Sequence, residues 1–203
     1  NVKYIPDAKN GIVIIPAHAE AHTIAAVVDE VRAATGWPVV VADDASPDET
    51  LERAREAGAV VLPLAVRLGA WGATQTGIRY ARQFGYSLAV TMDADGQHLS
   101  SSIQRLLAPI LRGEADVVIG ACTTRGTLAR RMAWRFFRFL TGLGVEDLTS
   151  GFRAYNRSAL AVLATRDATL LDYQDIGVLG LIRAAGLRIS EVEVPMQPRS
   201  IGK

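Results

Sequence analysis

The sequence contains little cysteine and no long hydrophobic run. Cys122 is its single cysteine, so an intramolecular disulfide and a metal cluster built on several thiolates are both excluded. No apolar run approaches the roughly 20 residues that a membrane-spanning helix needs, and residues 1–10 lack the hydrophobic region of a signal peptide. These absences favour a reducing, cytoplasmic setting.

A large excess of charge of either sign is missing as well. The 203 residues carry 22 basic and 21 acidic side chains, a formal net charge of +1, which argues against a general nucleic-acid-binding protein. Apolar residues make up 49%, so a chain of this length can bury the core of one domain. The chain begins without Met and stops abruptly at Lys203, and we expect it to be part of a longer protein.

Apolar runs alternate with helical periodicity along the chain. The patterns predict strands at residues 11–16, 38–42, 60–64, 87–92, 116–120 and 187–194, and helices around 24–31, 46–58, 74–84, 101–111, 127–141, 158–164 and 175–185. Such an alternation predicts a single α/β domain with a mostly parallel sheet. Ser46 and Glu49 suit the two ends of a capping box for the second helix.

Carboxylates follow three of these strands, at the ends where open α/β sheets bind ligands. Glu20 follows the first strand, Asp43 and Asp44 follow the second, and Asp93 and Asp95 follow the strand at 87–92. Mg²⁺ and Mn²⁺ prefer carboxylate oxygens together with substrate phosphates, so the pattern predicts a metal–diphosphate site. A solvated acidic turn is the alternative for an isolated Asp-x-Asp, but three acidic strand ends favour the metal site.

Other residues at these strand ends admit two interpretations. Asp43 is interpreted equally well as a functional carboxylate or as part of a loop that leads to the Ser46 cap. For Asp44 the functional interpretation is a hydrogen bond to the base or ribose of a nucleotide. His18 and Glu20 also suit a plain loop between strand and helix.

Several motifs in the chain form a recognisable set. They are Pro16–Glu20 (PAHAE), Val40–Thr50 (VVADDASPDET), Met92–His98 (MDADGQH), Asp147–Arg153 (DLTSGFR), Glu193–Pro195 (EVP) and Arg199–Lys203 (RSIGK). In this order and over nearly the whole chain, they resemble glycosyltransferase family 2, which has the GT-A fold. The resemblance is strongest to dolichyl-phosphate-mannose-synthase-like and polyprenyl-phosphate sugar transferases.

The resemblance implies a three-layer α/β/α domain over residues 1–203, with residues 1–120 as the nucleotide-sugar-binding half and 121–203 as the acceptor half. It implies catalytic roles for Asp93, Asp95, Asp147 and Arg153. It implies contacts to the nucleotide-sugar donor, a GDP- or UDP-sugar, from Pro16, His18, Glu20, Ala42, Asp44, Asp93 and Ala94. It implies Mg²⁺ or Mn²⁺ ligands at Asp93, Asp95 and Gln97, and phosphate contacts from Ser150, Arg153, Arg199 and Lys203.

The chain departs from the family pattern at three places. Cys122 stands where relatives often carry Arg, and Arg125 is a candidate replacement. Ala19 stands where Asn is usual. Relatives often continue past the position of Lys203, sometimes into membrane helices.

The resemblance also implies an inverting, single-displacement reaction. A hydroxyl acceptor would need a general base. Asp147 and Asp175 are the candidates, and each is as easily structural. A polyprenyl or dolichyl phosphate is already anionic and needs no base, so the missing base favours a lipid-phosphate acceptor.

An arginine-rich segment adds a second line of argument. Arg125, Arg130, Arg131, Arg135 and Arg138 have no acidic residue between them, and the expected helix at 127–141 has an apolar face. This predicts peripheral contact with the inner face of the cell membrane. An ordinary amphipathic helix packed on the sheet is the equal alternative.

The loop after the first strand argues against two other enzyme classes. A sugar nucleotidyltransferase would carry a Gly-rich first loop with Arg, and a dinucleotide dehydrogenase would carry G-x-G-x-x-G after the first strand; Pro16–Glu20 matches neither. A catalytically silent nucleotide-sugar-binding domain of a larger assembly and a transferase acting on a glycan hydroxyl remain as alternatives.

Overall fold

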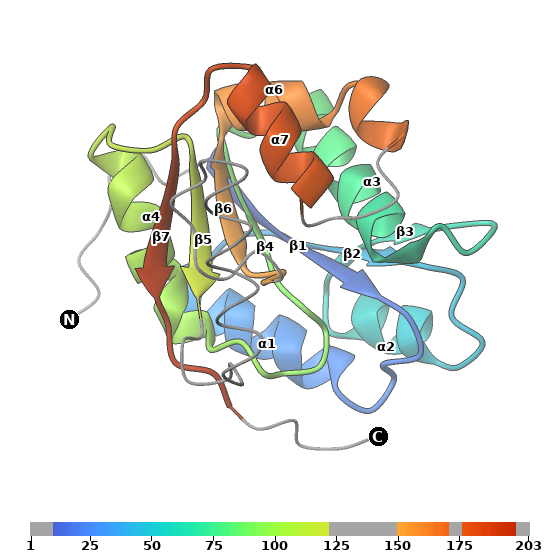
Figure 1. Ribbon diagram of the computed structural model, residues 1–203. Helices are drawn as coiled ribbons and strands as arrows, with labels where there is room; N and C mark the ends of the chain where they lie inside the picture. Colours follow the sequence, from blue (N-terminus) through green and yellow to red (C-terminus); the bar gives the residue numbers. More distant parts are fainter. Residues whose placement is uncertain (1–9, 122–149, 171–175, 198–203) are drawn as a thin grey trace, which may run out of the picture.

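A mixed sheet forms the centre of the molecule. The computed structural model describes residues 10–121, 150–170 and 176–197. In this part of the chain the sheet has the strand order β3-β2-β1-β4-β6-β5-β7 (Figure 1). The strands are β1 (Gly11–Ala17), β2 (Val39–Asp43), β3 (Val60–Pro63), β4 (Leu88–Thr91), β5 (Val117–Ala121), β6 (Arg153–Asn156) and β7 (Ile189–Glu193). β6 runs antiparallel to β4 and β5, while all other neighbouring pairs are parallel. The mostly parallel sheet is therefore confirmed.

Helices cover both faces of this sheet. One face carries α1 (Ile24–Thr35), α2 (Thr50–Glu56) and α4 (Ile103–Leu111), and the other carries α3 (Gly69–Gln83), α6 (Arg157–Leu163) and α7 (Ile176–Ala184) (Figure 1). Short 3₁₀ helices occupy Ser100–Ser102 and Asp167–Leu170. The predicted three-layer α/β/α arrangement is confirmed.

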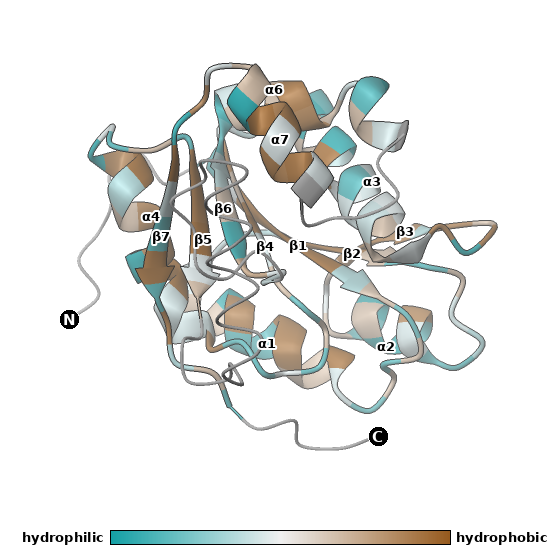
Figure 2. Ribbon diagram, in the orientation of Figure 1, coloured by the Kyte–Doolittle hydropathy of each residue, from teal (hydrophilic) through white to brown (hydrophobic). Residues whose placement is uncertain are grey.

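The strands supply a separate apolar core to each face. Alternate side chains of a strand point to opposite faces, so Val13 and Ile15 of β1 join the core under α1, while Ile12 and Ile14 join the core under α3. Figure 2 shows β1 and β5 as largely hydrophobic. Gly77 brings α3 close to β1, because a Cβ at this position would collide with the Ile14 side chain. No helix in the described ranges is long and apolar enough to cross a membrane.

Two predicted helix boundaries are wrong, and both lie near the carboxyl ends of the strands. α3 begins at Gly69 rather than near Thr74, and α2 begins at Thr50 rather than Ser46. The expected arginine-rich helix at 127–141 lies outside the described residues.

A polar cluster joins β5, β6 and β7 where the parallel strands β5 and β7 begin, at the sheet edge opposite their carboxyl ends. The Asp116 carboxylate accepts hydrogen bonds from Asn156 Nδ2 at 2.8 Å and from the Arg188 backbone N–H and Nε at 2.8 and 3.1 Å. The Arg188 side chain lowers the pKa of Asp116, assisted by the backbone N–H of Arg188 and by Asn156, although burial opposes the change. The carboxylate therefore stabilises the fold in its ionised form.

Replacing Asp116 with alanine is expected to lower the free energy of unfolding by about 1–2 kcal/mol at neutral pH, because three strands lose a shared acceptor. Since the folded state lowers the pKa, this contribution is complete above the ordinary carboxyl range and is lost as the pH falls through the folded value. Denaturant titrations of Asp116→Ala and wild type between pH 7 and pH 3 measure it. Glu114→Ala, in an exposed pair with Arg112, is the control and should have little effect. A difference that persists unchanged at pH 3 would contradict the assignment.

Candidate functional site

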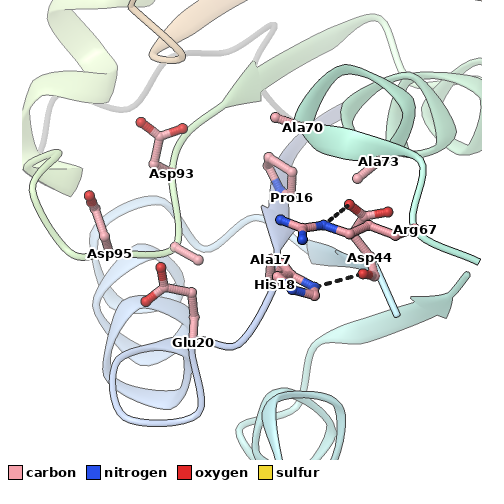
Figure 3. A pocket seen from close by; sticks show the side chains of 11 residues that line it. Pro16, Ala17, His18, Glu20, Asp44, Arg67, Ala70, Ala73, Asp93 and Asp95 are labelled. Atoms are coloured by element: carbon pink, nitrogen blue, oxygen red, sulfur yellow. Dashed lines mark hydrogen bonds and ion pairs between the residues drawn. The ribbon is translucent and has the colours of Figure 1, made fainter. Parts of the chain in front are cut away.

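A cleft lies at the carboxyl ends of β1, β2 and β4. Its volume is about 260 Å³, and it is lined by Pro16, Ala17, His18, Glu20, Asp44, Arg67, Ala70, Ala73, Asp93, Ala94 and Asp95. Figure 3 shows Asp93, Asp95 and Glu20 on one side of Pro16, with Asp44, His18 and Arg67 on the other. The predicted meeting of three strand ends is therefore observed.

Asp93 and Asp95 follow β4 directly and both line the cleft. The Asp93 side chain is 48% exposed. Space for its carboxylate depends on Gly151, since a Cβ on that residue would lie 2.5 Å from Asp93 Oδ1. Asp95 Oδ1 accepts the Gln97 backbone N–H at 3.0 Å, which closes a tight turn. The two carboxylates thus belong to one short loop beside an open cleft.

This donor set fits a divalent cation held jointly by protein and substrate. Within the described residues, no group of three or more His, Cys, Asp and Glu side chains could hold a metal ion by itself. Mg²⁺ sites commonly use one or two carboxylates and take their remaining ligands from phosphates and water. Asp93 and Asp95 suit such a site. Gln97 is buried beside them at 9% exposure, and its role as a metal ligand stays a prediction.

Side chains from residues 46–50 hold the loop that follows β1. Ala19 N–H donates to Ser46 Oγ at 3.1 Å, and Glu20 N–H donates to Thr50 Oγ1 at 2.8 Å. Asp48 accepts from Ala21 N–H at 3.3 Å and from Thr50 N–H at 3.2 Å. The predicted Ser46 cap is therefore wrong, because its hydroxyl serves the neighbouring loop and α2 has no side-chain cap. Residues 46–50 instead fix the backbone next to Glu20.

Ionisation of Asp48 strengthens this link. Burial raises the pKa of its carboxyl, but hydrogen bonds from the Thr50 hydroxyl and from the N–H groups of Ala21 and Thr50 outweigh burial, so the pKa is lowered. The acceptor is therefore charged at neutral pH, which makes the hydrogen bonds to the loop stronger.

Asp44 connects the cleft to the start of α3. Its Oδ1 accepts the Leu68 N–H at 2.6 Å and its Oδ2 accepts the Gly69 N–H at 2.9 Å, and the residue is buried. The carboxylate therefore caps α3, a structural role that the sequence interpretation omitted; the predicted contact with base or ribose stays a prediction. His18 Nδ1 lies 2.8 Å from the Asp44 carbonyl oxygen, which only accepts, so Nδ1 donates. Arg67 Nε lies 4.0 Å from Asp44 Oδ2 and the side chain is 68% exposed.

Three predicted site residues lie deeper in the protein. Arg153 is fully buried and its Nε donates to the Ser150 carbonyl at 2.8 Å, so it is not among the residues that line the cleft. The Ser150 hydroxyl oxygen accepts the Phe152 N–H at 3.2 Å. Ala42 is buried within β2. The phosphate and donor contacts expected of these residues stay predictions.

Asp43 presents a different situation at the end of β2. It is 3% exposed. Its Oδ1 is the one buried side-chain nitrogen or oxygen atom in the described part of the chain that lacks a hydrogen-bond partner. Its Oδ2 has only a long contact, 3.4 Å, from the Ser46 N–H. Asp43 is not among the residues that line the cleft, and both interpretations of this residue stay predictions.

Ala19 and Ala45 hold the two loops in a strained backbone conformation. Their φ angles are 56° and 52°, and they are the non-glycine residues with positive φ in the described ranges. The left-handed conformation costs a residue with a Cβ about 1–2 kcal/mol. Strain of this kind persists at sites where neighbouring structure fixes the backbone.

Ala45→Gly is expected to raise the free energy of unfolding by about 0.5–1 kcal/mol, since the relief of strain exceeds the extra freedom of glycine in the unfolded chain. The melting temperature should rise by about 1–4 °C. Ala26→Gly, at an exposed position inside α1, is the control and should lower it. A lower melting temperature for Ala45→Gly would disprove the strain argument.

Several predicted residues fall outside the described ranges: Asp147, Asp175, Arg199, Lys203, Cys122 and Arg125. Arg67, Ala70 and Ala73 also line the cleft, which the sequence patterns did not predict. The predicted start of α3 near Thr74 was too late, so residues 67–73 were given no role. Gly69, the first residue of α3, has a φ of 78°, which glycine adopts readily, so a glycine at this point was the available sequence signal.

Comparison with known proteins identifies the family. The model of glycosyl transferase family 2 matches residues 12–163, about three quarters of the chain. The chain belongs to glycosyl transferase family 2. It is therefore a glycosyltransferase, as the motifs predicted.

Two relatives of this family 2 glycosyltransferase have names that state a function. The polyprenol monophosphomannose synthase of Mycolicibacterium smegmatis is 34% identical over 73% of the chain, and the chain spans 62% of that protein's length. The undecaprenyl-phosphate mannosyltransferase of Micrococcus luteus is 32% identical over 95% of the chain and 85% of the relative. Activity of the whole protein toward such substrates is treated below as a proposal.

Solved structures confirm the GT-A fold of this family 2 glycosyltransferase. Glucosyl-3-phosphoglycerate synthase from Mycobacterium tuberculosis, in complex with phosphoglyceric acid, has a TM-score of 0.75 and 24% identity over 95% of the chain and 73% of that protein. The same enzyme with Mn²⁺, uridine diphosphate and phosphoglyceric acid has a TM-score of 0.73, with 23% identity over 95% of the chain and 72% of the enzyme.

Proposed function

We propose that this glycosyltransferase moves a sugar from a GDP- or UDP-sugar to a polyprenyl or dolichyl phosphate, with Mg²⁺ or Mn²⁺ as cofactor. The observation that carries the proposal is the pair Asp93 and Asp95 on the same cleft as Asp44 and Arg67. The relatives named for polyprenol and undecaprenyl phosphates support the acceptor class. The neighbour crystallised with Mn²⁺ and uridine diphosphate supports the donor class and the metal.

Asp93 and Asp95 would hold the metal, which supplies positive charge to the departing nucleoside diphosphate. Two carboxylates alone would repel a diphosphate, so the cation would strengthen the binding of the diphosphate as well as its departure. Arg67 is the cationic side chain that lines the described cleft, and it suits a second contact with the donor. These residues orient the donor so that its anomeric carbon faces the acceptor.

The acceptor reacts through a phosphate oxygen that is already anionic. This oxygen forms the new bond to the anomeric carbon as the bond to the nucleoside diphosphate breaks, with inversion at that carbon. No proton has to be removed, so neither Asp147 nor Asp175 is needed as a base. A glycan hydroxyl, in contrast, would need a general base to remove its proton.

A turnover assay tests the proposal directly. GDP-mannose, other GDP-sugars, UDP-sugars and dTDP-sugars are each supplied with Mn²⁺ or Mg²⁺ and with either a short polyprenyl phosphate or an oligosaccharide. The product is separated by chromatography, and donor binding is measured in parallel by calorimetry. One donor class is expected to give a lipid-linked sugar only when metal is present. Transfer to a glycan hydroxyl instead would replace the acceptor class. Metal-dependent donor binding without transfer to either acceptor would support a silent binding domain.

A lipid acceptor places the reaction at a membrane surface, and we propose that the enzyme works in the cytoplasm at the inner face of the cell membrane. The segment with five arginines between 125 and 138 lies outside the described residues and supports this through its charge. Basic residues near an anionic surface contribute about 1 kcal/mol each and are screened by salt.

Liposome co-sedimentation is expected to show weak binding to anionic vesicles that high salt removes. Replacing Arg130, Arg131, Arg135 and Arg138 with Gln should abolish this binding and leave donor affinity intact. The matched control replaces Arg82, Arg105, Arg112 and Arg157 with Gln, at exposed positions of the described residues. Equal sedimentation of wild type and the segment variant would remove the membrane contact from the proposal.

A further inference from the structure

The loop that carries Asp93 and Asp95 is closed by a buried histidine. The backbone N–H of Asp93 donates to His98 Nδ1 at 3.2 Å. This hydrogen bond links the first and last residues of the loop Asp93–His98. The His98 side chain is only 2% exposed. The hydrogen bond is partly buried, and through it His98 supplies an acceptor for a backbone N–H two residues after the end of β4.

This contact fixes the form of the imidazole ring. A backbone N–H only donates, so Nδ1 is the acceptor and the neutral ring carries its proton on Nε2. Asp93 Oδ2 lies 3.8 Å from the same nitrogen, beyond hydrogen-bond distance. His98 therefore makes a hydrogen bond to the backbone of Asp93, while the Asp93 carboxylate lies within ion-pair distance of the same ring nitrogen.

Two other segments hold the ring and its backbone. The ring stacks on Phe152, with centroids 4.9 Å apart and an angle of 15° between the planes. Phe152 follows Gly151, the residue whose missing side chain makes room for the Asp93 carboxylate. On the main chain, His98 forms an antiparallel bridge with Met196, and Gln197 N–H donates to the Gln97 carbonyl at 2.9 Å.

From these contacts we infer that His98 is a positioning residue for the metal–diphosphate site. Its Nδ1 sets the backbone of Asp93, and its stack on Phe152 fixes the loop against the segment that accommodates the Asp93 carboxylate. The inference rests on the proposed metal-binding role of Asp93 and Asp95. It assigns His98 no contact with donor, acceptor or metal.

Substitutions at His98 can separate the effect of the hydrogen-bond acceptor Nδ1 from the effect of the aromatic ring. His98→Asn places an amide oxygen near the position of Nδ1 and keeps the hydrogen bond, whereas His98→Gln carries its amide one bond farther out. His98→Phe keeps the aromatic stack but removes the Nδ1 acceptor from the Asp93 N–H. Loss of a group that orients a metal ligand commonly reduces metal affinity by about 10–100-fold.

The test measures Mn²⁺-dependent binding of GDP and UDP by calorimetry, together with thermal unfolding. His98→Phe and His98→Gln are expected to weaken the Mn²⁺-dependent affinity about 10–100-fold, and His98→Asn to restore most of it. Nucleotide binding without metal should change little in all three. His22→Phe and His22→Asn, at an exposed position, are the matched controls.

The outcomes separate this inference from the proposed function. Equal metal-dependent affinity for wild type and His98→Phe, or equal losses in His98→Asn and His98→Gln, would overturn the positioning role while the metal site stands. The Asn and Gln pair decides the matter even if His98→Phe does not fold. Absence of any Mn²⁺ effect in wild type would overturn the proposed metal site, and the inference with it.

Discussion

Asp95→Ala is expected to abolish the metal-dependent part of nucleotide-diphosphate binding and to reduce kcat/KM by at least about 10²-fold. Asp95 lies in the cleft on the loop after β4, and its Oδ1 already accepts the Gln97 N–H. Removing it takes away one of two carboxylates for the metal and loosens the turn that carries both. The remaining Asp93 would leave the cation, which offsets the repulsion between the carboxylates and a diphosphate, with one carboxylate ligand instead of two.

Calorimetry with UDP or GDP, with and without Mn²⁺, measures the loss. Asp29→Ala removes an exposed acid from α1 and serves as the control for a change of one charge. Thermal unfolding confirms that both variants are folded. Undiminished Mn²⁺-dependent affinity in Asp95→Ala would contradict the metal assignment.

Gly151→Ala is expected to reduce kcat/KM by about 10²-fold with little change in stability. The new Cβ would lie 2.5 Å from Asp93 Oδ1, so the carboxylate must move aside. A displacement of about 1 Å at a catalytic group is enough for a loss of this size. Gly151 does not have a positive φ angle, so alanine fits its backbone without strain.

Gly180→Ala in α7 is the matched control. A Cβ there meets nothing within 4 Å, and alanine in a helix should stabilise the protein slightly while activity stays unchanged. Steady-state kinetics at saturating and limiting Mn²⁺ distinguish a displaced metal ligand from a general defect. Full activity of Gly151→Ala would show that Asp93 tolerates the shift.

The sequence predicted six of the seven described strands and the functional ends of three of them, because buried parallel strands have a simple pattern; it did not predict the antiparallel strand β6. The runs at 11–16, 38–42 and 87–92 are mostly apolar, and each is followed within a few residues by acidic side chains. Parallel strands bring such ends to one edge, so the gathering of Glu20, Asp44 and Asp93 follows from order alone. No tertiary detail was needed for this part of the site.

Details that depend on tertiary contacts were beyond the sequence. Ser46 has the residue type of a helix cap, but its hydroxyl accepts from Ala19, across the gap between two loops. Asp44 caps α3, although it lies more than twenty residues before that helix begins. Local patterns report helix caps only when donor and acceptor are neighbours in the chain.

The burial of Arg153 was missed for a related reason. Arginine after Ser-Gly-Phe suggests a cation that meets phosphate, yet β6 runs antiparallel between β4 and β5 and takes Arg153 into the interior. The residues of a strand do not indicate whether it will run parallel or antiparallel to neighbours that are distant in the sequence. Its neighbours decide which side chains it buries.

The loop residues Gln97 and His98 pair with Met196 and Gln197, so part of the site can form only after the end of the described chain has been synthesised. During synthesis, β1 to β4 leave the ribosome long before Met196 and Gln197, so the early strands can collapse into a core while the Asp93–His98 loop still lacks one of its supports. Contacts between residues so distant in the chain form late, because a long loop must close first. Maturation of the cleft is thereby tied to completion of the last described strand, and a nascent chain arrested before β7 would have a folded core with an incomplete site.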